Sequence, residues 1–280
     1  MLNKNYGFVK PVITETHYVE GDGRLLGATI INPSGDWEKS LPKYEAQADK
    51  YETYGCTTFG STNQLETHIK YIYGTEPNYS ERYLYNLVNL NPPGADPQNV
   101  YEAIRKVGVI PQERLPMPDT LEEFKTPRPM TEELKNEGKG WIVNFFFDHD
   151  WVLSGTFNLE KLKTNLKKCP IGVSVTAWTE KDGLYVDDGE ENNHWCVLYK
   201  IDDKGMYVFD SYDHSKKTLS LTHNVQYAKR IVLYKRNPQE QLDNIKKNFI
   251  IILWTYVSTL VKKLHRVGGE IISGVFSLRN

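Results

Sequence analysis

The order of helix and strand patterns along the chain constrains its fold more than any other feature of the sequence. Helix patterns come first, at residues 56–73, 79–90 and 95–108. From residue 141 onward the pattern changes to short apolar and aromatic runs separated by turn signals, which is typical of strands. This segregation predicts an α+β fold, in which a helical half faces an antiparallel sheet half across a cleft.

Residues that favour helix ends mark the three expected helices. The first begins at Cys56, and Ser80 precedes the second and can cap it. In the third, Asp96 is a candidate N-cap, Pro97 occupies the first turn and Gly108 ends the run. On the first helix we expect these apolar side chains to point inward: Phe59, Leu65, Ile69 and Ile72.

Five strands are expected in the second half of the chain. The runs are WIVNFFF from residue 141, IGVSVTAW from 171, HWCVLYKID from 194, GMYVFDSYD from 205 and KRIVLYK from 229. Turn signals that contain Asp and Gly stand at 181–183 and 203–205. The second turn would join two consecutive strands as a hairpin, so these strands are expected to be neighbours.

The composition argues against several classes of protein. With 280 residues, 39% of them hydrophobic, the chain can bury a full core as one large domain, or as one domain with a tail. Its 34 Lys and Arg nearly balance its 36 Asp and Glu, and no basic run offers a footprint for a phosphate backbone. Nucleic acid is therefore not an expected partner. The three cysteines lack the spacing of metal ligands, so neither a metal nor a cofactor is expected.

The two ends of the chain differ in character. The first residues lack the apolar core and cleavage site of a signal peptide, so we expect the protein to begin inside a cell. Near the other end, Phe249 to Val261 form an apolar run of 13 residues, which is shorter than the roughly 20 residues of a membrane span. This apolar run could pack on the preceding domain, dock to a partner protein or bind a membrane surface, and the sequence leaves all three alternatives. We expect one helix over 246–266, beyond a domain edge near 237, and favour an external partner or lipid surface.

Cys56 has two competing interpretations. A free cysteine often behaves as a small buried hydrophobic residue. A cysteine that begins a helix, however, places its sulfur at the positive end of the helix dipole, which favours the thiolate. Its backbone N–H is also among the helix donors that lack an intrahelical partner and can bind an oxyanion. The second interpretation makes Cys56 a candidate nucleophile and requires a base.

His194 is the histidine placed for that role, because it opens an apolar strand directly after an acidic loop. A lone histidine at a strand end is often just a solvated side chain. Asp210, however, ends the next expected strand, 16 residues later. Since neighbouring antiparallel strands bring such ends together, Asp210 can accept a hydrogen bond from the imidazole and fix its tautomer. Strand alternation makes Cys196 a packing residue and not a second nucleophile.

Four segments of the sequence resemble the papain-like cysteine peptidases. They are DWEKSLPKYEAQ at 36–47, YGCTTFG at 54–60, KKCPIGVSVTAW at 167–178 and NHWCVLYKIDDKGMYVFDSYD at 193–213. The opening is most similar to divergent members from bacteriophages and bacteria. The resemblance implies a two-lobe thiol peptidase domain over 36–236, with an N-terminal extension over 1–35 and a tail over 237–280. It also implies that Cys56 is the nucleophile, His194 the base and Asp210 the group that orients the base.

The sequence departs from the papain pattern in several places. Papain has Asn at the orienting position, where this chain has Asp210. The oxyanion-hole glutamine usually lies six residues before the cysteine, where this chain has Lys50, so Gln47 is the candidate. Tyr212 stands where a tryptophan normally shields the histidine. Because 35 residues are too few for a long inhibitory propeptide, zymogen control of the usual kind is not expected.

The expected reaction is acyl transfer, with a peptide or protein as substrate. The Cys56 thiolate would attack a carbonyl, while its own N–H and Gln47 stabilise the oxyanion and His194 manages the proton. Two alternatives stay open: an amidase or transamidase that acts on cell-wall peptides, and an idle structural protein that docks through its C-terminal helix. Host cytoplasm or association with a virion would suit a chain of the phage type.

Overall fold

A computed structural model of the chain describes most of its first 236 residues. The described ranges are 6–20, 29–88, 94–213 and 216–236. The chain divides into two units, of which the first is Met1–Tyr234 and the second begins at Lys235. The helix expected over 246–266 lies outside the described residues, so its role stays a prediction.

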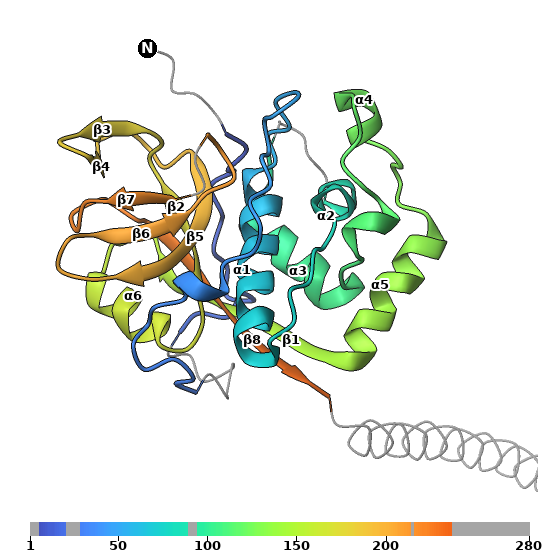
Figure 1. Ribbon diagram of the computed structural model, residues 1–280, viewed down its shortest axis with the longest axis horizontal. Coiled ribbons are helices and arrows are strands. Elements are labelled where there is room, and N and C mark those ends of the chain that lie inside the picture. Colours follow the sequence, from blue (N-terminus) through green and yellow to red (C-terminus); the bar gives the residue numbers. More distant parts are fainter. Residues whose placement is uncertain (1–5, 21–28, 89–93, 214–215, 237–280) are drawn as a thin grey trace, which may run out of the picture. The chain divides into compact units, whose positions relative to one another are not determined.

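Helices α2 to α5 gather on one side of the first unit and most of the sheet lies on the other, together with α6, while α1 stands between them (Figure 1). This is the α+β, two-lobe arrangement that the order of the sequence patterns predicts. The helices are α1 Cys56–Tyr73, α2 Glu81–Leu87, α3 Pro97–Val107, α4 Leu121–Phe124, α5 Glu132–Asn144 and α6 Leu159–Leu166, with short 3-10 turns at Glu38–Ser40 and Gln112–Arg114. None of the helices within the described ranges is long and apolar enough to cross a membrane.

The expected helix ends are present. Ser80 Oγ accepts a hydrogen bond from the backbone N–H of Tyr83 at the start of α2, with 3.1 Å between the atoms. Asp96 Oδ1 accepts one from the N–H of Gln98 at 2.8 Å and so caps α3. Gly108 ends α3 with a φ of 83°, a left-handed conformation that glycine adopts without strain. These local bonds satisfy helix-end groups that would otherwise lack partners.

Helix α1 is buried around nearly its whole circumference. Every residue from 56 to 69 is buried, because α1 packs against β5 on one side and against α2 and α3 on the other. Its polar side chains bond locally or to neighbouring loops, as Gln64 Nε2 does to the Pro170 carbonyl at 2.7 Å. A helix enclosed on all sides holds its first residue in a fixed place. Ile72, which we expected to point inward, is 38% exposed because the last turn extends past the core.

Eight strands form one sheet. They are β1 Phe145–Ser154, β2 Ile171–Val175, β3 Thr179–Lys181, β4 Leu184–Val186, β5 His194–Ile201, β6 Met206–Phe209, β7 Lys216–Leu219 and β8 Tyr227–Lys235. Their spatial order is β1-β8-β2-β5-β6-β7-β4-β3. Strand β5 pairs antiparallel with both β2 and β6, so the hairpin expected around the turn at 203–205 is present. The first residue of β5 and the residue after β6 therefore lie at the same edge of the sheet.

The run from residue 141 was wrongly assigned to a strand over its first four residues. Trp141 to Asn144 form the last turn of α5, and strand β1 begins at Phe145. Thr131 caps α5, and Trp141 packs inward with its indole N–H donating to the Tyr79 hydroxyl at 2.9 Å. The tertiary contact and the cap outweigh the strand preference of the aromatic and β-branched residues.

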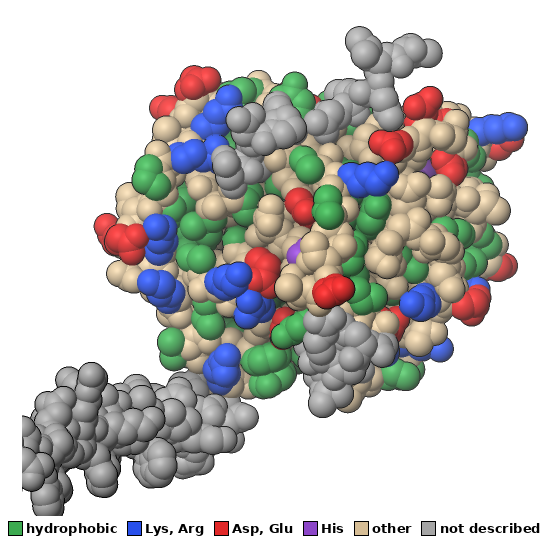
Figure 2. Space-filling view, turned by 180° about the vertical axis from the view of Figure 1, so that it is seen from behind, with side chains coloured by type: hydrophobic (Ala, Val, Ile, Leu, Met, Phe, Trp, Pro, Cys, Tyr) green, Lys and Arg blue, Asp and Glu red, His purple; other side chains and the backbone are tan. Residues whose placement is uncertain are grey.

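The face turned away from the viewer in Figure 1 carries charges of both signs. Lys and Arg side chains are interspersed with Asp and Glu over the described part of that face (Figure 2). Within the described ranges, no group of three or more His, Cys, Asp or Glu side chains is arranged to hold a metal ion.

Candidate active site

Cys56 is the first residue of α1 and is fully buried. Gly55 precedes it as the N-cap and makes no side-chain cap. The sulfur therefore lies at the positive end of an 18-residue helix, a position that stabilises a thiolate. Its Sγ is 3.9 Å from Thr57 Oγ1.

The antiparallel pairing of β5 with β6 brings His194 to Asp210. His194 Nε2 lies 2.5 Å from Asp210 Oδ1, and both side chains are fully buried. Asp210 therefore occupies Nε2 and leaves Nδ1 as the other ring nitrogen of an imidazole on which the Cys56 sulfur also acts. The structure thus brings together the three residues that the sequence resemblance assigned to catalysis.

Two neighbours raise the pKa of His194 despite its burial. Burial alone would lower the pKa of the imidazole, but the Asp210 carboxylate and then the Cys56 sulfur favour the charged ring by charge and by hydrogen bonding. Together they raise the pKa of His194 from 6.5 to about 9. A protonated imidazole beside the sulfur at neutral pH is the arrangement that activates a thiol nucleophile.

A buried lysine holds the other oxygen of Asp210. Lys217 Nζ lies 2.5 Å from Asp210 Oδ2 and donates to the Tyr212 carbonyl at 2.6 Å. Sequence reasoning missed Lys217, because it lies in the short polar run that forms β7 and carries no periodic signal.

Aromatic rings surround the His194 imidazole. The ring centroids of Tyr212 and Trp178 lie 6.4 and 5.4 Å from the imidazole centroid. Tyr212 thus contacts the histidine as the position of the missing tryptophan led us to expect. Trp178 was not singled out from the sequence, although it ends the IGVSVTAW run whose strand β2 pairs with β5.

Gln47 is fully buried beside the cysteine and is held there from several sides. Ser211 Oγ donates to Gln47 Oε1 at 2.8 Å, and the Gln47 backbone N–H donates to the Ser211 carbonyl at 2.9 Å. Thr53 Oγ1 donates to the Gln47 carbonyl at 2.8 Å. These bonds leave the Nε2 group of the amide to donate into the site, where it bonds to the Tyr6 carbonyl oxygen. Lys50, at the usual position of this glutamine, is exposed and pairs with Asp119.

The N-terminal segment of the chain occupies the site. Both Gln47 Nε2 and the Cys56 backbone N–H donate to one acceptor, the carbonyl oxygen of Tyr6, at 3.0 and 3.4 Å. The Tyr6 N–H in turn donates to the carbonyl of Asn193, directly before His194, at 3.3 Å. The Tyr6 ring packs edge-on against the imidazole, with 5.0 Å between centroids. Part of the N-terminal extension over 1–35 is therefore packed into the site, while the absence of zymogen control of the usual kind stays a prediction.

The next two residues fix this segment in place. Gly7 has a φ of 109°, and a side-chain Cβ there would lie 1.9 Å from the Tyr54 carbonyl oxygen, so only glycine fits. Phe8 pairs with Ala95 in a parallel bridge and stacks on Trp195 at 5.9 Å between ring centroids. Tyr6, Gly7 and Phe8 are thus packed against residues of the site.

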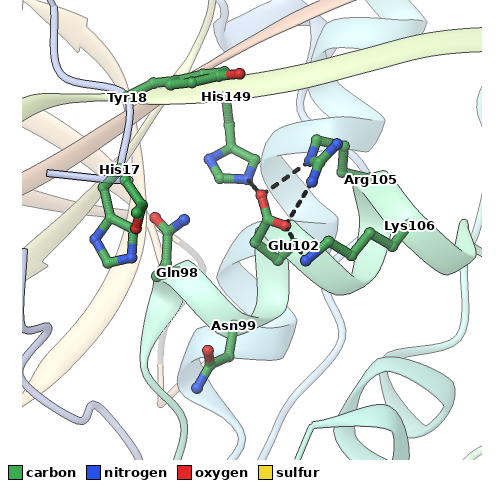
Figure 3. A pocket seen from close by; sticks show the side chains of 9 residues that line it. His17, Tyr18, Gln98, Asn99, Glu102, Arg105, Lys106 and His149 are labelled. Carbon is green, nitrogen blue, oxygen red and sulfur yellow. Dashed lines mark hydrogen bonds and ion pairs between the residues drawn. The ribbon is translucent and has the colours of Figure 1, made fainter. Parts of the chain in front are cut away.

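A separate cavity of about 430 Å³ lies between the N-terminal segment, α3 and β1 (Figure 3). Its charged groups pair with one another: Glu102 contacts His149, Arg105 and Lys106 at 3.2, 2.8 and 2.7 Å. The hydrogen bond from His149 contributes most to a pKa of Glu102 well below its usual range. The cavity contains none of the residues around Cys56, so we place the chemistry at Cys56 and not here.

The geometry around Cys56 suits acyl transfer. A cysteine sulfur lies at a helix N-terminus, an imidazole held by a carboxylate stands beside it, and two N–H donors converge on one carbonyl oxygen. These are the three parts that such a reaction requires.

No protein-family model and no curated protein sequence matches this chain. Solved structures of cysteine proteases do resemble it. The proform of Amb a 11, a ragweed pollen allergen, is 16% identical with a TM-score of 0.56, over 77% of this chain and 69% of that one. Procathepsin L2 from the Tenebrio molitor larval midgut is 15% identical with a TM-score of 0.57, over 81% and 78%. Xylellain from Xylella fastidiosa is 13% identical with a TM-score of 0.56, over 84% and 97%. The chain therefore has the papain-like fold that the sequence resemblance predicted.

Proposed function

We propose that this protein is a thiol peptidase that hydrolyses peptide bonds through Cys56, His194 and Asp210. The observation that carries the proposal is the placement of one peptide carbonyl oxygen between the Cys56 N–H and Gln47 Nε2, at the N-terminus of α1. Two donors that meet at one carbonyl beside a sulfur and an imidazolium form the environment that a tetrahedral oxyanion needs.

The reaction follows from these positions. The Cys56 thiolate attacks the substrate carbonyl carbon, and the two N–H donors take up the negative charge that develops on the oxygen. His194 Nδ1 then gives its proton to the leaving amine, which yields a thioester on Cys56. Water, deprotonated by the now neutral His194, attacks the thioester and releases the acid. Each oxyanion-hole donor contributes about 10² to 10³ in rate, so Gln47 affects the efficiency of this chemistry.

We further propose that residues 6–9 block the site until they leave it. The carbonyl between the two donors belongs to the protein itself, and the Tyr6 ring covers the imidazole. Cys56, His194, Asp210 and Gln47 are all less than 1% exposed, so an external peptide has no access while the segment is seated. Activity then depends on how often the segment opens.

A thiol-directed vinyl sulfone tests the nucleophile. The full-length protein is treated at neutral pH, digested and mapped, and the label is expected on Cys56. Cleavage of denatured casein, lost in Cys56→Ala, is the matching activity measurement. Equal labelling of Cys169 in the folded protein would overturn the assignment, since burial raises the pKa of that thiol to about 12.

The same assays separate the proposed peptidase from its alternatives. Release of amines from purified peptidoglycan, with casein left intact, would instead indicate a cell-wall amidase of similar chemistry. A folded protein whose Cys56 reacts with no probe, even after the segment is displaced, would indicate a structural role. The association with a phage particle rests on the resemblance of the opening segment at 36–47 and stays a prediction.

A further inference from the structure

Lys217 is the unusual group in this site. It is only 3% exposed, although lysine is among the residues least often buried. Its ammonium makes two short polar contacts, to Asp210 Oδ2 and the Tyr212 carbonyl, and lies 4.8 Å from the centroid of the Trp178 ring. A buried charge is retained where partners compensate the loss of water, and here the partner is the residue that orients the catalytic imidazole.

The two oxygens of Asp210 therefore serve two cations. Oδ1 faces His194 Nε2, and Oδ2 faces Lys217 Nζ. Papain-like enzymes that place an amide here present a neutral group to the imidazole, whereas a lone carboxylate would add a full negative charge. The ammonium of Lys217 cancels that charge, so the Asp210–Lys217 pair is formally neutral, as an amide is.

We propose that Lys217 is a positioning residue for the acyl-transfer reaction, which fixes the Asp210 carboxylate and offsets its charge so that His194 can still release its proton to the leaving amine. This inference rests on the proposed peptidase function and deepens it. Without Lys217, the uncompensated carboxylate would hold the proton on His194 too firmly for general-acid transfer, and its second oxygen would be buried without a cation.

Other titratable groups near His194 come from several elements. Cys56 on α1 and Asp210 after β6 act on the imidazole directly. Asp210 in turn acts on the surrounding groups Cys196 on β5, Tyr185 on β4 and Tyr44. Burial raises the pKa of each of these three groups, which favours their neutral forms. Lys217 is thus the cation that opposes Asp210 among the described residues around His194.

A double-mutant cycle with a pH profile tests the proposal. The rate of vinyl-sulfone labelling is measured against pH, and the alkaline limb of this profile follows the pKa of His194. In Lys217→Met, this limb should move up by about one pH unit, because removal of a cation several ångströms away favours the imidazolium. Turnover of casein should fall at least tenfold. In Asp210→Asn/Lys217→Met, where a neutral amide faces a neutral side chain, the limb should return to the wild-type position or below, and much of the turnover should recover. Lys217→Arg, which keeps the charge, should leave the limb unchanged.

Lys229→Met is the matched control. Lys229 is fully buried and bonds to His149 Nδ1 at 2.9 Å, away from the catalytic residues. Its replacement should lower the melting temperature without moving the limb, which separates loss of a buried lysine from loss of this lysine.

Two outcomes would overturn the role of Lys217: an unmoved limb in folded Lys217→Met, or the same loss of turnover from Lys217→Met whether residue 210 is Asp or Asn. If Lys217→Met does not fold, Lys217→Arg and the double variant carry the test. NMR titration of the His194 ring follows the same shift without any turnover. If casein stays intact even when the N-terminal segment is displaced, a shifted titration would therefore reject the peptidase function and still support the coupling between Lys217 and His194.

Discussion

Replacing Gly7 by alanine should unseat the N-terminal segment and accelerate labelling of Cys56. Gly7 has a φ of 109°, a conformation that strains any residue with a Cβ. The added Cβ would lie 1.9 Å from the carbonyl oxygen of Tyr54, a backbone atom two residues before the nucleophile. Because real Cβ contacts stay beyond 3.0 Å, the segment must move by about 1 Å or more.

The size of the effect follows from the contacts that such a movement loses. Tyr6 O accepts hydrogen bonds at 3.0 and 3.4 Å, and each contributes about 0.5–1.5 kcal/mol. The backbone conformation at Gly7 adds roughly 1–3 kcal/mol of strain once a Cβ is present. A total of about 2–6 kcal/mol corresponds to a labelling rate about 30-fold higher or more, at roughly 1.4 kcal/mol per factor of ten. The labelling rate stops rising once most molecules have the N-terminal segment displaced from the site.

Gly155→Ala is the matched control for this experiment. Gly155 has a similar φ of 118°, but no atom lies within 4 Å of a Cβ built there. Its replacement should lower stability slightly and leave the labelling rate of Cys56 unchanged. The rates are measured with a vinyl sulfone at neutral pH on both full-length variants. A folded Gly7→Ala protein that labels no faster than the wild type would show that the segment does not control access to the site.

Four further outcomes are expected. Labelling of the folded protein should be confined to Cys56, and comparable modification of Cys169 by peptide mapping would contradict this. His194→Ala should abolish turnover of casein and slow labelling, whereas Asp210→Asn should keep measurable turnover because an amide can also orient an imidazole; full activity in His194→Ala would remove the proposed base. Since the pKa of His194 rises from 6.5 to about 9 on folding, its contribution to stability is complete below pH 6.5 and is lost as the pH rises through 9, and denaturant titrations from pH 6 to 10 measure this loss. Truncation after residue 237 should leave a more soluble protein with full activity if the tail serves an external partner, and aggregation would show that it packs on the body.

Much of the fold could be predicted because local signals and the long-range order agree. Asp96 and Gly108 carry their information within one turn of α3, and the structure has both as predicted. His194 and Asp210 could be paired because a short turn forces their strands to be neighbours. The prediction for residues 141–144 was wrong because their aromatic and β-branched composition suits a strand. Their helical conformation is set by the Thr131 cap ten residues before Trp141 and by the hydrogen bond of the buried Trp141 indole.

The parts of the site that sequence reasoning missed come from distant segments without a periodic pattern. Tyr6 lies 41 residues before Gln47, and Ser211 lies 164 residues after it, yet both bond to the same amide. Lys217 stands in a four-residue polar strand, where a lysine would ordinarily be solvated. Only the folded sheet edge brings these groups to the catalytic residues, so no spacing rule in one sequence could have identified them.

The blocked site and the catalytic site are built from the same atoms. The donors that hold the Tyr6 carbonyl are the donors that would stabilise an oxyanion, so a change in the position of these donors affects both. A segment tethered to its own domain is present at a high effective concentration, and modest contacts suffice to keep it seated. No other residue at position 7 could keep the segment in this place, because the Gly7 backbone passes against Tyr54 with no room for a side chain. The short run Tyr6, Gly7 and Phe8 therefore has a role that its polar and unremarkable setting in the sequence does not reveal: it competes with substrate for the carbonyl position beside Cys56.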